Sequence, residues 1–218
     1  MWGSTGNAQP TAELERKCSM NYYDSCVDLG IRKYFGNEVK VDKAGAAVLF
    51  NKACNNNYFE GCTNLGLMKK SGDGVIKNIS DAFDLLLKAC NGGNAMGCSN
   101  LGVLYSTGVG IQNNKYKAAE LYLKACDGNY ALGCVNLGYM YNNGDGIDKN
   151  YTKAITLYQK ACESNVAEGC TNLGVMYLKS EGVQQDKKKS LFLFNKACGL
   201  NEQRACEFQI KLKELNQK

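Results

Sequence analysis

Cysteine is the side chain with the greatest capacity for chemistry in this 218-residue sequence, and it recurs in a fixed pattern. The 12 cysteines form six C-x7-C pairs, each beginning 36 residues after the one before it. The pairs are Cys18/Cys26, Cys54/Cys62, Cys90/Cys98, Cys126/Cys134, Cys162/Cys170 and Cys198/Cys206. Such thiols can form disulfides, bind zinc or remain reduced in a core. The fixed period indicates a stacked repeat architecture.

Other catalytic and ligand-binding patterns are absent or weak. The sequence has no histidine, the commonest metal ligand and general base, which excludes metallo-β-lactamase chemistry. It also lacks the S-x-x-K motif of serine β-lactamases; Lys70-Ser71-Gly72 resembles only their short K-T/S-G element. Gly108-Val109-Gly110 lacks the third glycine and the strand of a dinucleotide-binding fingerprint. We therefore predict no catalytic residue, no metal and no cofactor.

The composition is typical of a folded chain with modest charge. Hydrophobic residues make up 44% of it, and 26 Lys and Arg against 21 Asp and Glu give a formal charge of +5. This charge falls short of the clustered basic face of a nucleic-acid-binding protein. No apolar run is long enough to span a bilayer. Residues 1–10 match no repeat and lack a signal-peptide core, so we interpret them as a linker or an artificial tail, with any export leader outside this sequence.

Each second cysteine begins a segment with helical periodicity, the first helix of a unit. Asn-Leu-Gly follows it at residues 64–66, 100–102, 136–138 and 172–174, with Asp28-Leu29-Gly30 in the first copy. A tyrosine follows the leucine by four residues in the last three copies, which places both on one apolar face. We expect the glycine of this motif to let an alanine-bearing second helix pack closely.

A glycine-rich turn leads to that second helix, whose expected N-cap residues are Asp42, Asn78, Asn114, Asn150 and Asp186. The helix ends at the first cysteine of the next pair. Three residues later only Asn or Gly occurs, which favours the left-handed conformation that closes a helix. In one continuous helix the paired cysteines would lie roughly 12 Å apart, whereas a disulfide needs about 4.4–6.8 Å. A disulfide between them therefore requires the chain to reverse direction between the two cysteines, where the Asn or Gly residue favours a turn.

These elements predict an all-α domain of antiparallel helix pairs over residues 11–218. Its full units are 26–61, 62–97, 98–133, 134–169 and 170–205. The motif is lost at both ends, so residues 11–25 and 206–218 are expected to cap the array.

The combined motif, G-C-x-N-L-G-x-M/L-Y-x-x-G-x-G-V/I-x-x-N followed by A-x-x-L-Y-x-K-A-C, closely resembles the Sel-like repeat, a relative of the tetratricopeptide repeat. The cysteine-rich, secreted Hcp family of bacterial proteins, with one disulfide per repeat, matches still better over residues 11–218. The resemblance implies an exported, right-handed α/α solenoid of disulfide-bridged helix-turn-helix repeats. It also implies an association with penicillin binding, weak β-lactamase activity and host immune interactions.

Structural disulfides are therefore the favoured use of the cysteines, since zinc prefers C-x2–4-C spacing and commonly histidine. The expected bridges are Cys18–Cys26, Cys54–Cys62, Cys90–Cys98, Cys126–Cys134, Cys162–Cys170 and Cys198–Cys206. Each closes a short loop and stabilises the fold by roughly 2.5 kcal/mol. They imply an oxidising compartment, secreted or periplasmic.

The main binding candidates are the repeated asparagines, Asn64, Asn100, Asn136 and Asn172. In a tetratricopeptide repeat this position faces the concave groove, where an amide can donate and accept hydrogen bonds with an extended peptide. Alternatively, each asparagine ties down a loop or cap in its own repeat. Nearby residues that differ between copies would set specificity: Val103, Ser106, Tyr139, Asn142 and Asn143.

We therefore predict a monomeric, exported scaffold that binds a host- or cell-wall-related peptide or protein in its groove, without nucleic acid and without a membrane span. Peptidoglycan and β-lactam fragments are further ligand classes that the resemblance suggests. A weak penicillin-binding hydrolase is the alternative function, supported by the resemblance and not by the residues.

Overall fold

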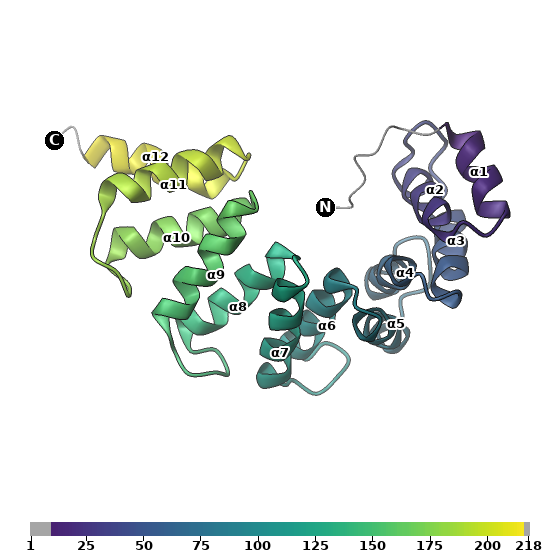
Figure 1. Ribbon diagram of the computed structural model, residues 1–218, viewed down its shortest axis with the longest axis horizontal. Helices are drawn as coiled ribbons and strands as arrows, with labels where there is room; N and C mark the ends of the chain where they lie inside the picture. Colours follow the sequence, from purple (N-terminus) through teal and green to yellow (C-terminus); the bar gives the residue numbers. More distant parts are fainter. Residues whose placement is uncertain (1–9, 216–218) are drawn as a thin grey trace. The chain divides into compact units, whose positions relative to one another are not determined.

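The computed structural model describes residues 10–215, which form helices joined by short turns (Figure 1). The helices are α1 (Thr11–Ser19), α2 (Tyr23–Phe35), α3 (Lys43–Asn55), α4 (Phe59–Ser71), α5 (Ile79–Asn91), α6 (Ala95–Thr107), α7 (Lys115–Asp127), α8 (Ala131–Asn143), α9 (Tyr151–Glu163), α10 (Ala167–Lys179), α11 (Lys187–Gly199) and α12 (Gln203–Leu215). The predicted all-α fold of repeated helix pairs is confirmed. The even-numbered helices are the first helices of the sequence motif, and the odd-numbered helices are the second ones.

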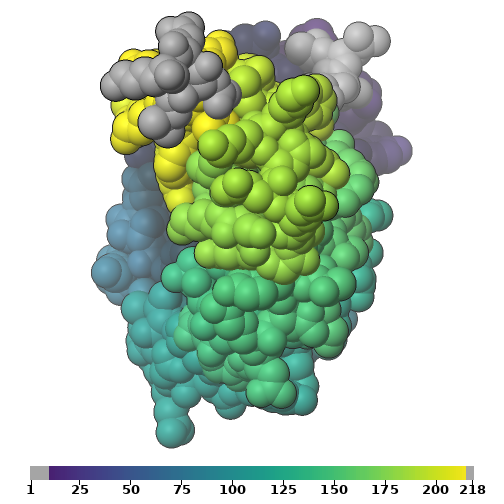
Figure 2. All heavy atoms as spheres, turned by 90° about the vertical axis from the view of Figure 1, so that its left-hand side faces the viewer, coloured from purple at the N-terminus to yellow at the C-terminus, as the bar shows by residue number. Residues whose placement is uncertain are grey.

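Two compact units divide the chain after Gln112, so that α1–α6 belong to one unit and α7–α12 to the other. Within each unit, helices that follow one another in sequence pack against each other. The atoms of α7–α12 appear in Figure 2 as consecutive bands from teal to yellow, because each repeat stacks on its sequence neighbours.

Among residues 10–215, no helix combines the length and the apolar character needed to cross a bilayer. The predicted N-terminal tail lies almost entirely outside the described residues, apart from Pro10.

The second helices after α1 begin where the sequence places their N-caps. The Asn150 Oδ1 atom accepts a hydrogen bond from the backbone N–H of Lys153 at 2.9 Å, and the other four predicted caps make the same contact. A side-chain acceptor at this position satisfies a backbone N–H that has no partner within the helix. The five predicted N-caps are therefore confirmed.

The turns within each cysteine pair have the predicted left-handed residue. Asn129 has φ 63° and Asn165 has φ 57°, and the equivalent residues of the other four pairs also have positive φ. Asparagine is among the few residues that tolerate this conformation. The turn reverses the chain within three residues between α7 and α8, from Gly128 to Tyr130.

This reversal brings both cysteines of each pair together, and all six predicted disulfides are present. Their Cα–Cα distances lie between 4.4 and 4.7 Å. Each bridge joins the end of a second helix to the start of the next first helix. Cys126 and Cys134 are each only 1% exposed, so this bridge forms part of the core, whereas Cys198 and Cys206 are only partly buried.

Glycines let the helices approach closely, but their contacts differ in part from the expectation. A Cβ atom on Gly138 would lie 2.8 Å from the ring of Tyr158, and one on Gly174 would lie 2.8 Å from the ring of Phe194. The Asn-Leu-Gly glycine therefore receives a large side chain rather than an alanine. The alanine contact belongs to the glycine before the second cysteine, because a Cβ on Gly169 would lie 2.6 Å from that of Ala161.

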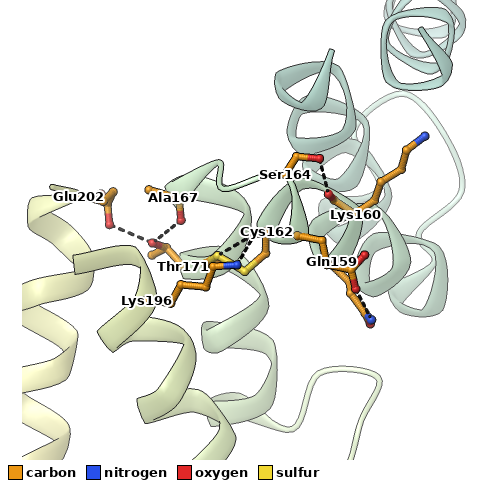
Figure 3. The surroundings of a disulfide bond; sticks show 10 residues. Gln159, Lys160, Cys162, Ser164, Ala167, Thr171, Lys196 and Glu202 are labelled. Atoms are coloured by element: carbon orange, nitrogen blue, oxygen red, sulfur yellow. Dashed lines mark hydrogen bonds between the residues drawn. A yellow bond between two sulfur atoms is a disulfide. The ribbon is translucent and has the colours of Figure 1, made fainter. Parts of the chain in front are cut away.

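A lysine two residues before the first cysteine connects successive repeats. Lys196 Nζ donates a hydrogen bond of 2.8 Å to the backbone carbonyl of Cys162 (Figure 3). Lys52, Lys88 and Lys160 make the same contact with the first cysteine of the preceding pair, at 2.6 to 2.9 Å. The acceptor lies in the last turn of a helix, where carbonyls lack partners and a positive charge is favourable. This contact gives the lysine of Lys-Ala-Cys a structural role at Lys52, Lys88, Lys160 and Lys196.

Replacing Lys196 by Met is expected to lower the free energy of unfolding by about 1 kcal/mol, because a charge-assisted hydrogen bond is lost while the apolar stem is retained. Urea unfolding followed by circular dichroism measures the change. Lys188, an exposed residue of the same helix, provides the control, and Lys188→Met should change stability by less than about 0.5 kcal/mol. Equal effects of the two substitutions would show that the carbonyl contact contributes nothing.

A second polar contact also crosses between repeats. The Thr171 hydroxyl lies 2.9 Å from Glu202 Oε2, an atom that also accepts from the backbone N–H of Ala205 and so caps α12 (Figure 3). In the other unit the Thr63 hydroxyl lies 2.9 Å from Oδ1 of Asn94, the N-cap of α6. Each of these threonines therefore helps to fix the start of the next first helix.

Candidate peptide-binding face

The predicted binding residues lie on four first helices, and we call this set the first-helix face. Its members are Asn64, Asn100, Val103, Ser106, Asn136, Tyr139, Asn142, Asn143 and Asn172. Because α4 contacts α6 and α8 contacts α10, successive repeats place their asparagines on neighbouring helices within each unit. The face is thus described as two groups, one on α4 and α6 and one on α8 and α10.

The four repeated asparagines do not share one environment. Asn100, Asn136 and Asn172 are partly exposed, whereas Asn64 is only 1% exposed. Asn64 therefore differs from the expectation that each amide is open to a ligand at the surface. Tyr139, three residues after Asn136 and on the same side of α8, is 55% exposed.

Unsatisfied polar atoms single out two members of this face. Among the described residues, the buried side-chain nitrogen and oxygen atoms without a hydrogen-bond partner are Nδ2 and Oδ1 of Asn64 and Oδ1 of Asn142. Buried polar atoms in folded proteins nearly always have a partner, so each exception needs an explanation. A bound group that donates and accepts hydrogen bonds would supply one.

Two other amides of the face form a hydrogen bond within their own helix. Asn100 Nδ2 donates to the carbonyl of Met96, and Asn143 Nδ2 donates to the carbonyl of Tyr139, both at 2.9 Å. The Asn100 contact ties down neither a loop nor a cap, the alternative role of the repeated asparagines.

The repeat pattern matches a known family. The sequence profile of the Sel1 repeat matches residues 24–58, 59–94, 95–130, 131–166 and 167–202. The chain belongs to the Sel1 repeat family. A search of curated proteins found no match, so the family assignment supplies a scaffold without a named activity.

Solved Sel1 repeat structures show the same fold. A Sel1 repeat protein from Oxalobacter formigenes is 26% identical, with a TM-score of 0.80 over 85% of this chain and 76% of that one. A protective antigen of uropathogenic Escherichia coli with an SLR fold is 29% identical, with a TM-score of 0.76 over 88% of this chain and 41% of that one. Cysteine-rich protein B of Helicobacter pylori is 34% identical, with a TM-score of 0.50 over 60% of this chain and 96% of that one.

Two partly buried carboxyl groups, one on α2 and one on α4, escaped the sequence-based prediction. Asp28 occupies on α2 the position that asparagine has in later Sel1 repeats, and Glu60 lies one turn before Asn64 on α4. Burial raises the pKa of Asp28; Asp24 adds to this effect, and Arg32 opposes it. Burial also raises the pKa of Glu60, and the charge of Asp28 adds to it. In the sequence, the Asp that replaces the Asn of the repeat motif at position 28 was the feature that could have indicated these carboxyl groups.

The Lys70-Ser71-Gly72 segment lies at the end of α4. The Ser71 hydroxyl donates to backbone carbonyls of its own helix, at 3.0 Å for Leu67. Burial lowers the pKa of the neighbouring Lys70 ammonium group. Gly72 is the left-handed C-cap of the helix, with φ 80°. A helix-ending role accounts for these residues, and the hydrolase alternative gains no support from them.

Proposed function

We propose that this Sel1 repeat protein binds extended segments of a partner protein on the part of the first-helix face that each unit carries. The observation that carries the proposal is the presence of unsatisfied amide atoms in each part of that face, both ends of the Asn64 amide in one unit and Oδ1 of Asn142 in the other. An extended peptide offers a backbone N–H and a carbonyl at regular intervals. Asparagine can accept from the first and donate to the second, so the chemistry is complementary.

Residue differences between repeats support a preference for particular peptide sequences. Where α6 has Val103 and Ser106, α8 has Tyr139 and Asn142 at the equivalent positions. The shared amides would hold the backbone of the bound peptide, and the variable side chains would contact its residues. Repeat proteins commonly use their extended surfaces for binding in this manner.

The cross-links support a location outside the cytoplasm. Twelve cysteines in six disulfides are typical of proteins exposed to oxidising conditions, since cytosolic reductants keep thiols reduced. We therefore propose an exported protein whose partner is met outside the cytoplasm.

Substitution of Asn136 tests the proposed function. Linear peptides are first selected from a random library by the folded, oxidised chain. Asn136→Ala is then expected to raise the Kd of a selected peptide about tenfold, because the loss of a hydrogen-bonding amide costs on the order of 1.4 kcal/mol. Asn100→Ala should act in the same direction on peptides that bind the other unit, at α6. Fluorescence polarisation measures binding, and thermal unfolding of each variant is recorded in parallel.

The matched control is Asn195→Ala, which removes an exposed asparagine from the second helix α11. It should change neither the Kd nor the melting temperature. A lower melting temperature for Asn136→Ala with an unchanged Kd would instead assign Asn136 a structural role. Failure to select any peptide would count directly against the proposal.

A further inference from the structure

The start of α9 carries a sequence motif that the proposed peptide binding does not use. Asn150-Tyr151-Thr152 has the form N-x-S/T, in which the asparagine can accept an N-linked oligosaccharide. Such a motif is expected on the surface of an exported protein. Asn150 and Tyr151 are partly exposed and Thr152 is exposed, at the point where the turn after α8 enters α9. The motif therefore lies where a transferase can reach it.

Helix capping leaves the reactive atom of Asn150 available. Its Oδ1 atom accepts the hydrogen bond from the backbone N–H of Lys153 at 2.9 Å. Glycosylation uses the other end of the amide, because the sugar becomes attached to Nδ2. This Nδ2 group and the Thr152 hydroxyl both lack a hydrogen-bond partner among residues 10–215. Since a glycosylated asparagine keeps its carbonyl oxygen, the N-cap of α9 can persist after the modification.

Capping alone does not account for the residues around Asn150. Aspartate is the N-cap of α3 and of α11, so the fold does not require an asparagine at this position. It does not require a hydroxyl group two residues later either, where the five copies have Ala44, Ser80, Tyr116, Thr152 and Lys188. Two residues before the cap, the copies have Lys40, Ile76, Gln112, Asp148 and Gln184. Asparagine, a following hydroxyl group and a preceding carboxylate therefore coincide in the fourth copy alone.

We propose that Asn150 is an N-glycosylation site, modified outside the cytoplasm by an oligosaccharyltransferase. The donor is an oligosaccharide linked to a polyprenyl diphosphate. Nδ2 forms a bond to the anomeric carbon of the first sugar and loses one proton, while the bond from that carbon to the diphosphate oxygen breaks and polyprenyl diphosphate leaves. The inference rests on the proposed export of the chain and is independent of peptide binding.

Two neighbouring side chains would identify Asn150 to the transferase. The exposed Thr152 hydroxyl can donate and accept hydrogen bonds. Asp148 is also exposed, and it forms no ion pair within the part of the chain that the structure describes. Its negative charge is therefore available to a basic group of the transferase. The second N-x-S/T motif of the chain, Asn78-Ile79-Ser80, follows Ile76 and lacks this charge.

The test exports the full chain, with an added secretory leader, to a bacterial periplasm that contains a bacterial oligosaccharyltransferase and its lipid-linked donor. Mass spectrometry of the intact protein should show one added oligosaccharide, and mass spectrometry of its peptides should place it on Asn150. Asn150→Asp is expected to abolish the added mass. This variant keeps a side-chain acceptor for the N-cap, as α3 and α11 do, so it should fold, and circular dichroism checks that it does. Thr152→Val should also abolish the added mass.

Asn78→Asp is the matched control, since it makes the same change at the N-cap of α5. It should leave the added mass unchanged, whereas Asp148→Asn should strongly reduce the glycosylated fraction. A chain without added mass, or with the oligosaccharide on Asn78 alone, would overturn the site. Equal modification of Asn78 and Asn150 would overturn the part assigned to Asp148. Because the added leader provides export, a negative result counts against the site, and peptide selection still tests the proposed function separately.

Discussion

Replacing both Cys126 and Cys134 by alanine is expected to lower the free energy of unfolding by about 3 kcal/mol. Roughly 2.5 kcal/mol of this arises because the unfolded chain regains the freedom that the short cross-linked loop removes. The remainder reflects packing lost around two sulfur atoms that are almost fully buried. Urea unfolding without reductant, followed by circular dichroism, measures the change as a lower midpoint.

Reduction of the unmodified protein provides the matching control. Dithiothreitol should lower the urea midpoint further than the double substitution does, because it opens all six bridges. Reductant should also still destabilise the double variant, since five bridges remain in it. A variant midpoint equal to that of the oxidised protein would mean that stacking alone holds α7 and α8 in place.

Replacing Gly169 by alanine is expected to cost about 2 kcal/mol, the second-largest effect. The added Cβ would lie 2.6 Å from the Cβ of Ala161 and 3.0 Å from the backbone nitrogen of Cys162. Backbone atoms cannot move aside as a flexible side chain can, so α9 and α10 must separate at their disulfide-linked ends. This strain outweighs the gain of up to about 1 kcal/mol that alanine brings inside a helix.

Gly199→Ala is the corresponding control. Gly199 ends α11, and a Cβ there would meet no atom within 4 Å. Its urea midpoint should stay the same or rise slightly. If the two alanine variants had similar midpoints, the close approach of α9 and α10 would not require glycine.

Most of the fold could be predicted because its determinants are local. The N-cap asparagine of α9 acts within three residues, and the left-handed Asn129 acts within a single turn. The spacing of the cysteines required a reversal at the same place. Two independent local signals therefore agree on the turn within each cysteine pair, and a third marks the start of the second helix.

The environment of the candidate site could not be predicted in the same way. Asn64 and Asn136 occupy the same position in the repeat motif, yet one is buried and the other partly exposed. Burial depends on the residues of the preceding and following repeats, which the motif does not specify. The contact of Lys196 with the Cys162 carbonyl spans 34 residues and was missed for a related reason. The recurrence of the lysine in Lys-Ala-Cys was visible in the sequence, but the carbonyl group that the lysine contacts was not.

The shortness of the six bridges also has a consequence for how the chain acquires its cross-links. Each disulfide spans a sequence separation of eight, and the entropy cost of closing a loop grows with its length. For every cysteine, the correct partner is therefore also the nearest and the fastest to reach. Pairing can proceed from one end as the chain emerges into an oxidising compartment, since no bridge has to wait for a distant segment. A protein of this design is expected to oxidise repeat by repeat, with little need for enzymes that reshuffle wrong disulfides.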